Sequence, residues 1–527
     1  MKARRRVQAR GSRGYRWAAA LLAGVLAAGL LAACGSGGDG DRDSSSKSGG
    51  TLTVAITYPP SSFELNTQCS SEVFQLAYEP LIRVSPTGGY EPAIAESWAY
   101  SKNNTVFTMK IRKGVKFQDG TDVTVASVVD TLNYYKSVPG IIKGYIEPWT
   151  VKAVGDDSVQ ISYDEPFIGI EDILSDVGMC NNGMIISEAG LKNPDKLKTE
   201  MFGAGPYEYV ASESNPGDHY TFKPNPNYYD KSRQNWDEVV LRVIPDPTTA
   251  LNALKTGQVQ VDVVGGETLV DQAKSAGFDV TLSTYYGMCI LVSDTEGVVS
   301  KPLADVRVRQ AIALALDREG IAAASGPEAK PQDQIAQIDG VGYDPDLPSR
   351  YTYNLDEAKR LMAEAGYPDG FDVEMLWSSD DVPAKTPLTA AVEELSKIGI
   401  NIKLKSIPFG ELVTARQSKK YPLSAASFGL YGDLPSNAYR LYKLPYADVF
   451  NVFGNTDPEI DKAYNALVTS SESNLDENAR LFNEAMGAAA WVIPVVALPQ
   501  YAFSDGIDIG DPGQLGYYAI NSWKRAS

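Results

Sequence analysis

The sequence predicts a large α/β protein that is built from more than one lobe. Its 527 residues exceed what a single hydrophobic core usually fills, and the hydrophobic content of 43% is typical of globular chains. A strand, a helix and a second strand follow one another between residues 371 and 404, which is the order of a βαβ unit on a largely parallel sheet. The 31 prolines and 46 glycines are spread between short elements, as in an α/β protein with many loops.

The first 33 residues have the pattern of an export signal. Seven Lys and Arg residues lie in the first 16 positions without an acidic residue, and the uncharged run WAAALLAGVLAAGLLAA follows. That run is shorter than the about 20 apolar residues that span a bilayer. Its end, LAAC at 31–34, resembles the lipobox of bacterial lipoproteins, in which the cysteine becomes the lipid-carrying N-terminus after cleavage. We therefore expect a signal peptide at 1–33, a lipidated (palmitate-carrying) Cys34 and a flexible tether over 34–50.

Apolar periodicity then predicts the first elements of the folded part. Alternation predicts strands at 51–56 (TLTVAI) and 106–111 (VFTMKI), and helical spacing over 308–315 predicts an amphipathic helix. Asn354 followed by Glu357 is typical of a helix cap, and the apolar stripe after it ends at Gly366 and Pro368. The βαβ unit consists of a strand at 371–377, a helix with an apolar stripe over 388–395, and a strand at 400–404.

Charge and cysteine content indicate an exported, acidic protein. The net charge is −18, and loss of the basic signal makes the remainder more acidic, so the sequence predicts repulsion from nucleic acid and from anionic lipid surfaces. With Cys34 lipidated, three cysteines remain in a compartment where disulfides persist. Cys69 and Cys180 lie in loop-like segments and form the favoured pair, although the sequence alone leaves the other two pairings open. Cys289, in the apolar run MCILV, is then a small buried hydrophobe.

Motifs for catalysis or for a cofactor are missing from the sequence. The single histidine, His219, lies in the strand-like segment GDHYTF, where a surface or packing role is expected. There is no G-x-S-x-G, H-E-x-x-H, C-x-x-C or P-loop motif, so we predict no enzyme activity, no cofactor and no metal. A Cys–His pair stays conceivable, and the total of 66 Asp and Glu residues leaves a two-carboxylate glycosidase open.

An ordered series of segments resembles the extracellular solute-binding proteins of ABC importers, the family that includes dipeptide and oligopeptide receptors. The segment AESWAYSKNNTVFTMKIRKGVKFQDGTDVT at 95–124 resembles the signature region of the family. The other segments agree in order and spacing and are LAYEPLIR at 76–83, GAGPYEYV at 203–210, PNPNYYD at 224–230, PLADVRVRQAIALALDRE at 302–319, NLDEAKRLMAEAGYPDGF at 354–371 and DPEIDKAYNALV at 457–468. The match covers nearly all of the chain after the tether.

The resemblance implies a two-lobed fold of the periplasmic-binding-protein type (class II, cluster C), with an extra inserted domain and a hinge. Domain I would comprise 51–86, 184–283 and 490–527, domain II would be the insertion 87–183, and domain III would span 284–489. Ligand would lie between domains I and III and would favour the closed state that a membrane permease recognises. The protein would be a monomeric substrate-binding lipoprotein at the extracytoplasmic face of the bacterial cell membrane, with a permease and its ATPase subunits as partners.

Candidate ligand-binding residues follow from the resemblance and from the aromatic character of interlobe pockets. The segment 283–291 occupies the interlobe crossing of the family, 427–439 resembles its ligand-facing loop, and 61–66 follows the first strand. With Trp377 at the end of a predicted strand, these segments offer Phe63, Asn66, Tyr285, Tyr286, Met288, Trp377, Phe428, Tyr431 and Asp433. For each aromatic residue, ordinary core packing is an equally open role.

One departure from the dipeptide receptors concerns the substrate. In those receptors an aspartate that pairs with the amino terminus of the peptide precedes an Asp-Pro pair by a few residues. Here Asp433 resembles the later aspartate, with Leu434 in place of proline, and the earlier position falls near Leu430. Because a buried ammonium without a paired carboxylate is costly, either Asp433 takes that role or the ligand is not a free peptide. The alternative function is a solute-sensing surface lipoprotein or a hydrolase that has kept this fold.

Overall fold

A computed structural model of the protein describes residues 49–65, 71–85, 89–139, 143–176, 181–263, 265–347, 350–379, 381–428, 434–443, 450–512 and 519–526. All of these residues belong to one unit, Lys47–Ser527. For residues 71, 283–286, 409–410, 413 and 427–428, only the backbone is described.

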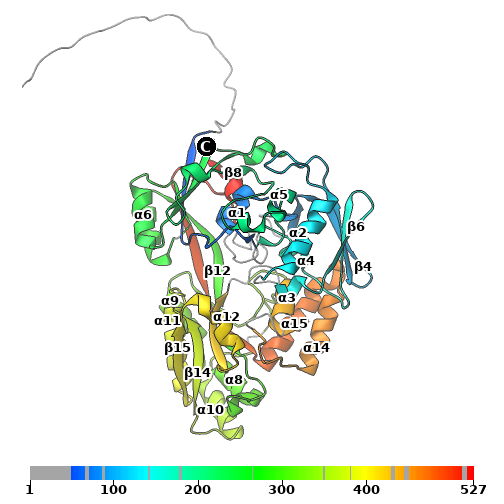
Figure 1. The fold of residues 1–527 in the computed structure, drawn as a ribbon. Coiled ribbons are helices and arrows are strands. Elements are labelled where there is room, and N and C mark those ends of the chain that lie inside the picture. Colours follow the sequence, from blue (N-terminus) through cyan, green and yellow to red (C-terminus); the bar gives the residue numbers. More distant parts are fainter. Residues whose placement is uncertain are drawn as a thin grey trace, which may run out of the picture. The chain divides into compact units, whose positions relative to one another are not determined.

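A mixed sheet with 11 strands runs through the described part of the chain (Figure 1). Its strand order is β15 (Ile400–Ile407), β14 (Phe371–Ser378), β16 (Leu423–Phe428), β12 (Asp279–Val292), β17 (Val492–Ser504), β11 (Val261–Asp262), β1 (Thr51–Ile56), β10 (Glu238–Val243), β9 (His219–Pro224) and β8 (Tyr207–Tyr209), and β13 (Lys330–Pro331) pairs with β17.

The prediction of a largely parallel sheet is wrong. Parallel pairing is found where β1 meets β10 and β11, and where β14 meets β15 and β16. The long strands β12 and β17 are antiparallel to each other, and β12 is also antiparallel to β16. These two strands come from distant parts of the sequence, so local patterns do not reveal how they pair.

The elements that the sequence predicts from local periodicity are confirmed. β1 and β5 (Val106–Ile111) have the predicted bounds, and β14, α11 (Lys385–Ser396) and β15 form a βαβ unit with Phe371 opposite Ile400. α8 (Val306–Leu314) occupies the predicted amphipathic helix. The cap of α10 (Leu355–Glu364) is also present, because Oδ1 of Asn354 accepts a hydrogen bond from the N–H of Glu357 at 3.0 Å. His219 begins β9 and is half-buried, with its Nδ1 2.6 Å from Asp218.

The remaining elements surround the large sheet. A second sheet of four strands has the order β4 (Ala95–Ser101), β5, β7 (Ser158–Ser162) and β6 (Thr150–Val154). Two further sheets have two strands each. One pairs β2 (Ile82–Val84) with β3 (Tyr90–Pro92), and the other pairs β18 (Ile507–Asp508) with β19 (Lys524–Arg525). The other α-helices are α1 (Ser71–Ala77), α2 (Val125–Ser137), α3 (Lys143–Ile146), α4 (Ile170–Ile173), α5 (Glu188–Leu191), α6 (Pro247–Lys255), α7 (Val270–Ser275), α9 (Arg318–Ser325), α12 (Phe409–Gln417), α13 (Leu434–Ala438), α14 (Pro458–Val468) and α15 (Leu475–Ala489).

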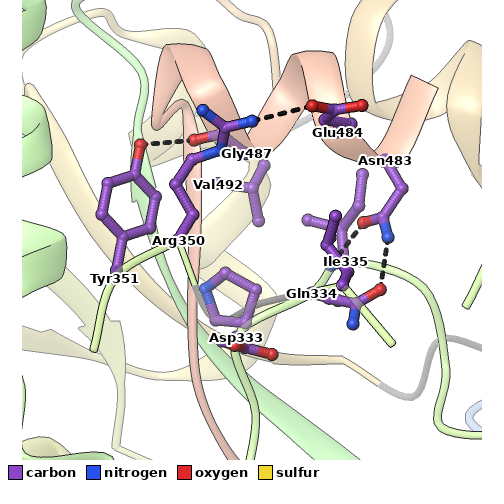
Figure 2. A pocket seen from close by; sticks show the side chains of 11 residues that line it. Asp333, Gln334, Ile335, Arg350, Tyr351, Asn483, Glu484, Gly487 and Val492 are labelled. Carbon is purple, nitrogen blue, oxygen red and sulfur yellow. Dashed lines mark hydrogen bonds and ion pairs between the residues drawn. The ribbon is translucent and has the colours of Figure 1, made fainter. Parts of the chain in front are cut away.

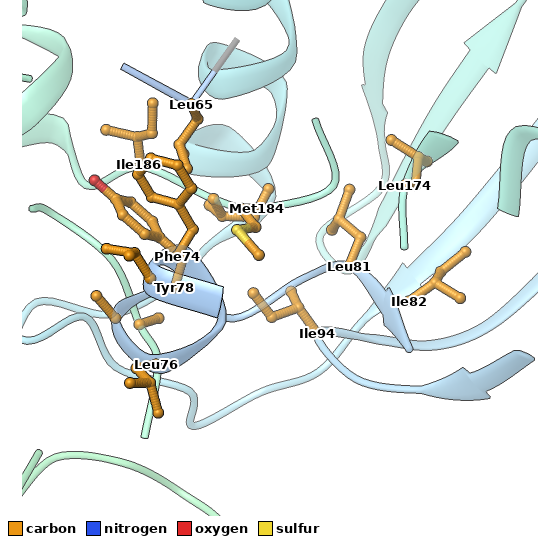
Figure 3. Packing of buried hydrophobic residues seen from close by; sticks show 14 of the residues in the cluster. Leu65, Phe74, Leu76, Tyr78, Leu81, Ile82, Ile94, Leu174, Met184 and Ile186 are labelled. Carbon is orange, nitrogen blue, oxygen red and sulfur yellow. The ribbon is translucent and has the colours of Figure 1, made fainter. Parts of the chain in front are cut away.

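The buried apolar residues form separate cores in two lobes. The first lobe contains a cluster from 52 to 261 and 502 to 523 together with a smaller cluster from 55 to 273 and 501 to 503. In the larger cluster, Phe74 of α1 and the adjacent Tyr78 pack beside Met184 and Ile186 (Figure 3). A Cβ on Gly205 would lie 2.4 Å from the carbonyl carbon of Ala77, so only glycine lets the chain pass at this point.

The second lobe has two clusters, one from 288 to 498 and one that consists mainly of residues 289–492. A buried arginine ties four of its segments together. Nε of Arg318 donates to the carbonyl groups of Gln332 at 3.1 Å and Pro494 at 2.9 Å, and Nη1 donates to those of Ala313 at 2.9 Å and Tyr351 at 3.1 Å. Since each carbonyl belongs to a different segment, Arg318 links these four segments by hydrogen bonds.

Candidate ligand-binding site

The two lobes are joined where β12 and β17 run side by side from one core to the other (Figure 1). At one end, Ala502 and Phe503 of β17 belong to the cores of the first lobe. At the other end, Met288 of β12 and Leu498 of β17 belong to a core of the second lobe. Residues 283–287 and 499–500 lie between these cores, and we call them the crossing.

The pairing of β12 with β17 is irregular at the crossing. The register shifts between Leu282 and Thr284, which leaves Ser283 as an extra residue, and it shifts again between Met288 and Cys289. Pro499 lies opposite Tyr285, and proline cannot donate a ladder hydrogen bond. Extra residues bend and twist a strand pair, so the crossing is the place where the two lobes can rotate against each other.

Several of the predicted ligand-binding residues come together at this crossing. The backbones of Tyr285 and Tyr286 lie in β12 at the crossing, and Gly287 pairs with Phe428 at the end of β16. The side chains of Tyr285, Tyr286 and Phe428 lie outside what the structure describes. Met288 is fully buried in the core of the second lobe.

Two other predicted residues have described side chains. Trp377 is near the end of β14, which runs parallel to β16, so both strands end at the same edge of the sheet. Ligands of α/β proteins commonly bind beyond the carboxyl ends of strands. Phe63 packs inside the first lobe, where its ring centroid lies 5.0 Å from that of Tyr209 and 6.0 Å from that of Tyr220, and only 5% of Phe63 is exposed.

The remaining predicted residues, Asn66, Tyr431 and Asp433, lie outside the described residues, and so do Cys34, Cys69 and Cys180. Their roles stay predictions. Cys289 is a buried free thiol, as expected, and burial raises its pKa to about 12.

Beyond the crossing, the lobes touch through an aromatic contact. Tyr439, the first residue of the π-helix η8 (Tyr439–Lys443), follows α13 and the predicted ligand loop in the sequence. Its ring centroid lies 5.0 Å from that of Phe167 and 5.4 Å from that of Tyr145, both in the first lobe. Burial raises the pKa of the Tyr439 phenol, which therefore remains neutral at ordinary pH.

Close backbone approach and a hydrogen bond add to this contact between the lobes. Gly169 has φ of +90°, and a Cβ there would lie 2.7 Å from the Cα of Ser436 in α13. Near the crossing, Oε1 of Glu267 accepts a hydrogen bond from the N–H of Glu328 at 2.9 Å. The structure therefore shows the lobes in mutual contact.

The profile of the bacterial extracellular solute-binding proteins, family 5 (middle region), matches residues 89–448. The chain belongs to this family. The match includes most of the second lobe, the four-stranded sheet and the crossing strand β12.

Two sequence relatives of this family 5 solute-binding protein are named for the ligand that they bind. Heme-binding protein A of Haemophilus influenzae is 26% identical over 460 residues, which cover 76% of this chain and 78% of that protein. The glutathione-binding protein GsiB of Escherichia coli K12 is 25% identical over 376 residues, which cover 68% of this chain and 69% of that protein.

A solved structure shows the same fold. The periplasmic binding protein DppA from Helicobacter pylori, in complex with the peptide STSA, matches with a TM-score of 0.75. The sequences are 19% identical, and the match covers 91% of this chain and 98% of DppA. The two-lobed α/β fold that the sequence resemblance implies is thereby confirmed.

A small cavity of about 20 Å³ in the second lobe of this solute-binding protein is not a ligand site (Figure 2). It holds at most one water molecule. The polar groups that line it bond to one another, since Asn483 contacts Gln334 at 2.7 Å and Arg350 contacts Glu484 at 2.9 Å.

Within the described ranges, no three His, Cys, Asp or Glu side chains are arranged to hold a metal ion. Every helix among those residues is too short or too polar to cross a bilayer.

The sequence analysis missed the residues through which the lobes touch. Tyr439 lies in the segment 427–439 that resembles the ligand-facing loop, and Asn104, whose Nδ2 donates to the carbonyl groups of Val468 and Ser470, lies in the family signature, but no contact was predicted for either residue. Nothing in the sequence marks Gly169. A signal for Asn104 exists, because KNN directly precedes the segment that leads into the predicted strand at 106–111, and Asn is enriched in left-handed turns. Nothing in the sequence predicts which residues the turn at 102–104 contacts.

Proposed function

We propose that this family 5 protein is the receptor of an ABC importer, and that it captures a peptide or a similar small solute between its lobes. The observation that carries the proposal is the crossing, where two irregular strands join lobes with separate cores. A ligand that contacts both lobes binds the closed state more tightly and shifts the population toward it. A permease that recognises the closed state then receives only loaded protein.

Peptides are the ligand class that the relatives favour. Glutathione and STSA, the ligands of GsiB and DppA, are both short peptides, whereas heme-binding protein A is named for a tetrapyrrole. We propose that Asp433 pairs with the amino terminus of the ligand, and that Tyr285, Tyr286, Trp377, Phe428 and Tyr431 supply contact surface, with Phe63, Asn66 and Met288 beside them. Charge pairing would offset the cost of burying the ammonium group.

The three-domain division is part of this proposal. The chain from 284 to 489 would be domain III, and the clusters support this, because those of the second lobe consist almost entirely of residues 288–498. The four-stranded sheet, formed from residues 95–162, lies within the insertion 87–183 proposed as domain II. Domain I would take the other segments, 51–86, 184–283 and 490–527.

The proposed setting is the extracytoplasmic face of a bacterial membrane. The signal at 1–33 would be removed, Cys34 would carry lipid, and 34–50 would tether the folded unit to the membrane. A permease with its own ATPase subunits would be the partner of a monomeric receptor. We also propose that the protein catalyses no reaction, since the family consists of binding proteins.

A thermal unfolding screen of the chain that begins after Cys34 tests this function. Short peptides, oligosaccharides and metal chelates would each be present in large excess. At 100 times its dissociation constant a ligand adds about 2.7 kcal/mol of stability, so we expect peptides to raise the unfolding midpoint by several degrees. N-acetylated copies of the active peptides are the matched control for Asp433.

Both the acetylated peptides and an Asp433→Ala variant should lose the shift if Asp433 binds the free amino terminus. A shift that survives acetylation would show that the anchor is elsewhere. If peptides have no effect while sugars or chelates raise the midpoint, the peptide class is wrong.

A further inference from the structure

The turn between β4 and β5 has a backbone that L-amino acids rarely adopt. Lys102, Asn103 and Asn104 have φ angles of 52°, 56° and 60°, so three consecutive residues are left-handed and none is glycine. Left-handed residues normally occur singly, although Asn tolerates this region better than most residues. Strain of this kind persists only where other contacts hold it, and it gathers where a protein needs a side chain in one position.

The side chain of Asn104 extends from the first lobe to the second. Its Nδ2 donates hydrogen bonds to the carbonyl oxygen of Val468 at 3.0 Å and to that of Ser470 at 2.7 Å. Val468 is the last residue of α14, where carbonyl groups lack a partner within the helix. In Figure 1 the sheet that contains β4 lies next to α14 and α15.

Both sides of this contact are held in place by their own lobe. The carbonyl oxygen of Asn104 accepts the N–H of Phe167 at 3.0 Å, which ties the turn to the first lobe. Ser470 is buried, and its hydroxyl donates to the carbonyl of Ala466 at 3.0 Å and accepts from Asn478 at 2.8 Å. The donor and its acceptors are therefore positioned before they meet, so little ordering is needed to form the bonds.

We propose that Asn104 is a closure latch that holds the second lobe against the first in the closed state. In the described part of the chain, the backbone passes between the lobe cores at β12 and β17, so rotation at the crossing would separate Asn104 from α14 while both lobes stay folded. A bond made only in the closed state increases its population, and it tightens the apparent affinity for every ligand by one common factor. The inference rests on the proposed function, because a latch requires lobes that open and close.

Asn103 supplies a matched control in the same turn. It shares the left-handed backbone, its side chain is exposed, and it makes no hydrogen bond with the residues that the structure describes. Asn104→Ala removes the donors, Asn104→Asp places a carboxylate against two carbonyl oxygens, and Asn104→Gly removes the donors while it relieves the backbone. The same substitutions at Asn103 alter strain and charge equally but do not reach the second lobe.

The test measures affinity and interface opening in the full chain. Calorimetry gives the dissociation constants for two probes, glutathione and the tetrapeptide Ser-Thr-Ser-Ala. Hydrogen exchange of Leu434–Lys443, which lies at the lobe contact, reports opening without ligand. We expect Asn104→Ala to weaken both probes by the same factor, about fivefold to thirtyfold for two lost hydrogen bonds.

Asn104→Asp should weaken binding further, and Asn104→Gly should weaken it even though its backbone is relaxed. Exchange across Leu434–Lys443 should be faster in the Asn104 variants, and each Asn103 variant should stay within about twofold of the unaltered chain in every readout.

Equal behaviour of the Asn104 and Asn103 variants in affinity and exchange would overturn the latch. Unequal factors for the two probes would also overturn it, because Asn104 would then act on the ligand itself. If neither probe binds the unaltered chain, the proposed peptide class fails, and exchange alone decides on the latch. Faster exchange in the Asn104 set then supports it, and equal exchange refutes it.

Discussion

Replacing Arg318 with methionine tests whether one buried cation holds the second lobe together. Methionine has a similar length and is apolar, so it fills most of the space without donating a hydrogen bond. The substitution would leave four carbonyl groups, those of Ala313, Gln332, Tyr351 and Pro494, without their donor.

The expected loss can be bounded from these contacts. A buried carbonyl that loses its partner costs about 1 to 3 kcal/mol, so four of them cost at least about 4 kcal/mol. Removing the guanidinium recovers some free energy, because burial of this charge is unfavourable and lowers the pKa of Arg318 to about 10. Nη2, which has no partner among the described residues, adds to that recovery. We therefore expect the free energy of unfolding to fall by about 4 kcal/mol, which is the lower end of the range of about 4 to 12 kcal/mol for four carbonyl groups.

Unfolding of the second lobe can be followed at Cys289. The thiol is buried, so it is unreactive until β12 separates from its neighbours. Pulse alkylation at increasing urea, with mass spectrometry of the peptide that contains Cys289, reports this lobe even if the chain unfolds in several steps. Arg350→Met is the matched control, because the exposed pair of Arg350 with Glu484 is worth less than about 1 kcal/mol. Similar small losses in both variants would refute the reasoning.

Two further predictions concern titration and lobe contact. Burial raises the pKa of Asp176 to about 6 from an ordinary 3.8, against the opposing effects of the Val84 N–H and Arg83. Because the folded state then holds this proton more tightly than the unfolded chain, the contribution of Asp176 to the free energy of unfolding should fall by about 2 kcal/mol as pH rises from 4 to 6, and urea titrations of Asp176→Asn should lack this decline. Gly169→Ala should weaken ligand binding, because its Cβ would collide with Ser436 when the lobes meet, and calorimetry that gives an unchanged affinity would contradict this.

Local patterns in the sequence predict much of the second lobe. The βαβ unit from Phe371 to Ile407 has the predicted order, since the apolar residues of each element recur at the period of a strand or of a helix. The cap at Asn354 needs only a partner three residues away, and the burial of Cys289 follows from the apolar run around it. In these cases the partners are close in sequence or share one face.

Partners that are distant in sequence explain the failures. The pairing of β12 with β17 decides that the sheet is mixed, and neither strand carries a local sign of the other. The carbonyl groups that accept hydrogen bonds from Arg318 include that of Pro494, which is distant in the sequence. The residues next to Arg318 therefore predict the start of a helix but not its hydrogen bonds to other segments. The turn at Asn104 is the intermediate case, because its left-handed backbone is a local property and its contact with α14 is not.

The strength of the lobe contact bears on discrimination between ligands. A shift from 1% to 99% closed requires about 5.5 kcal/mol. The two hydrogen bonds of Asn104 and the one between Glu328 and Glu267 contribute about 1 kcal/mol each, so together they fall short of that amount. Apolar contacts such as those of Tyr439, or the ligand itself, must supply the remainder. A receptor that closed fully on its own would present empty protein to its permease, so a latch of limited strength tightens binding while the ligand still controls closure.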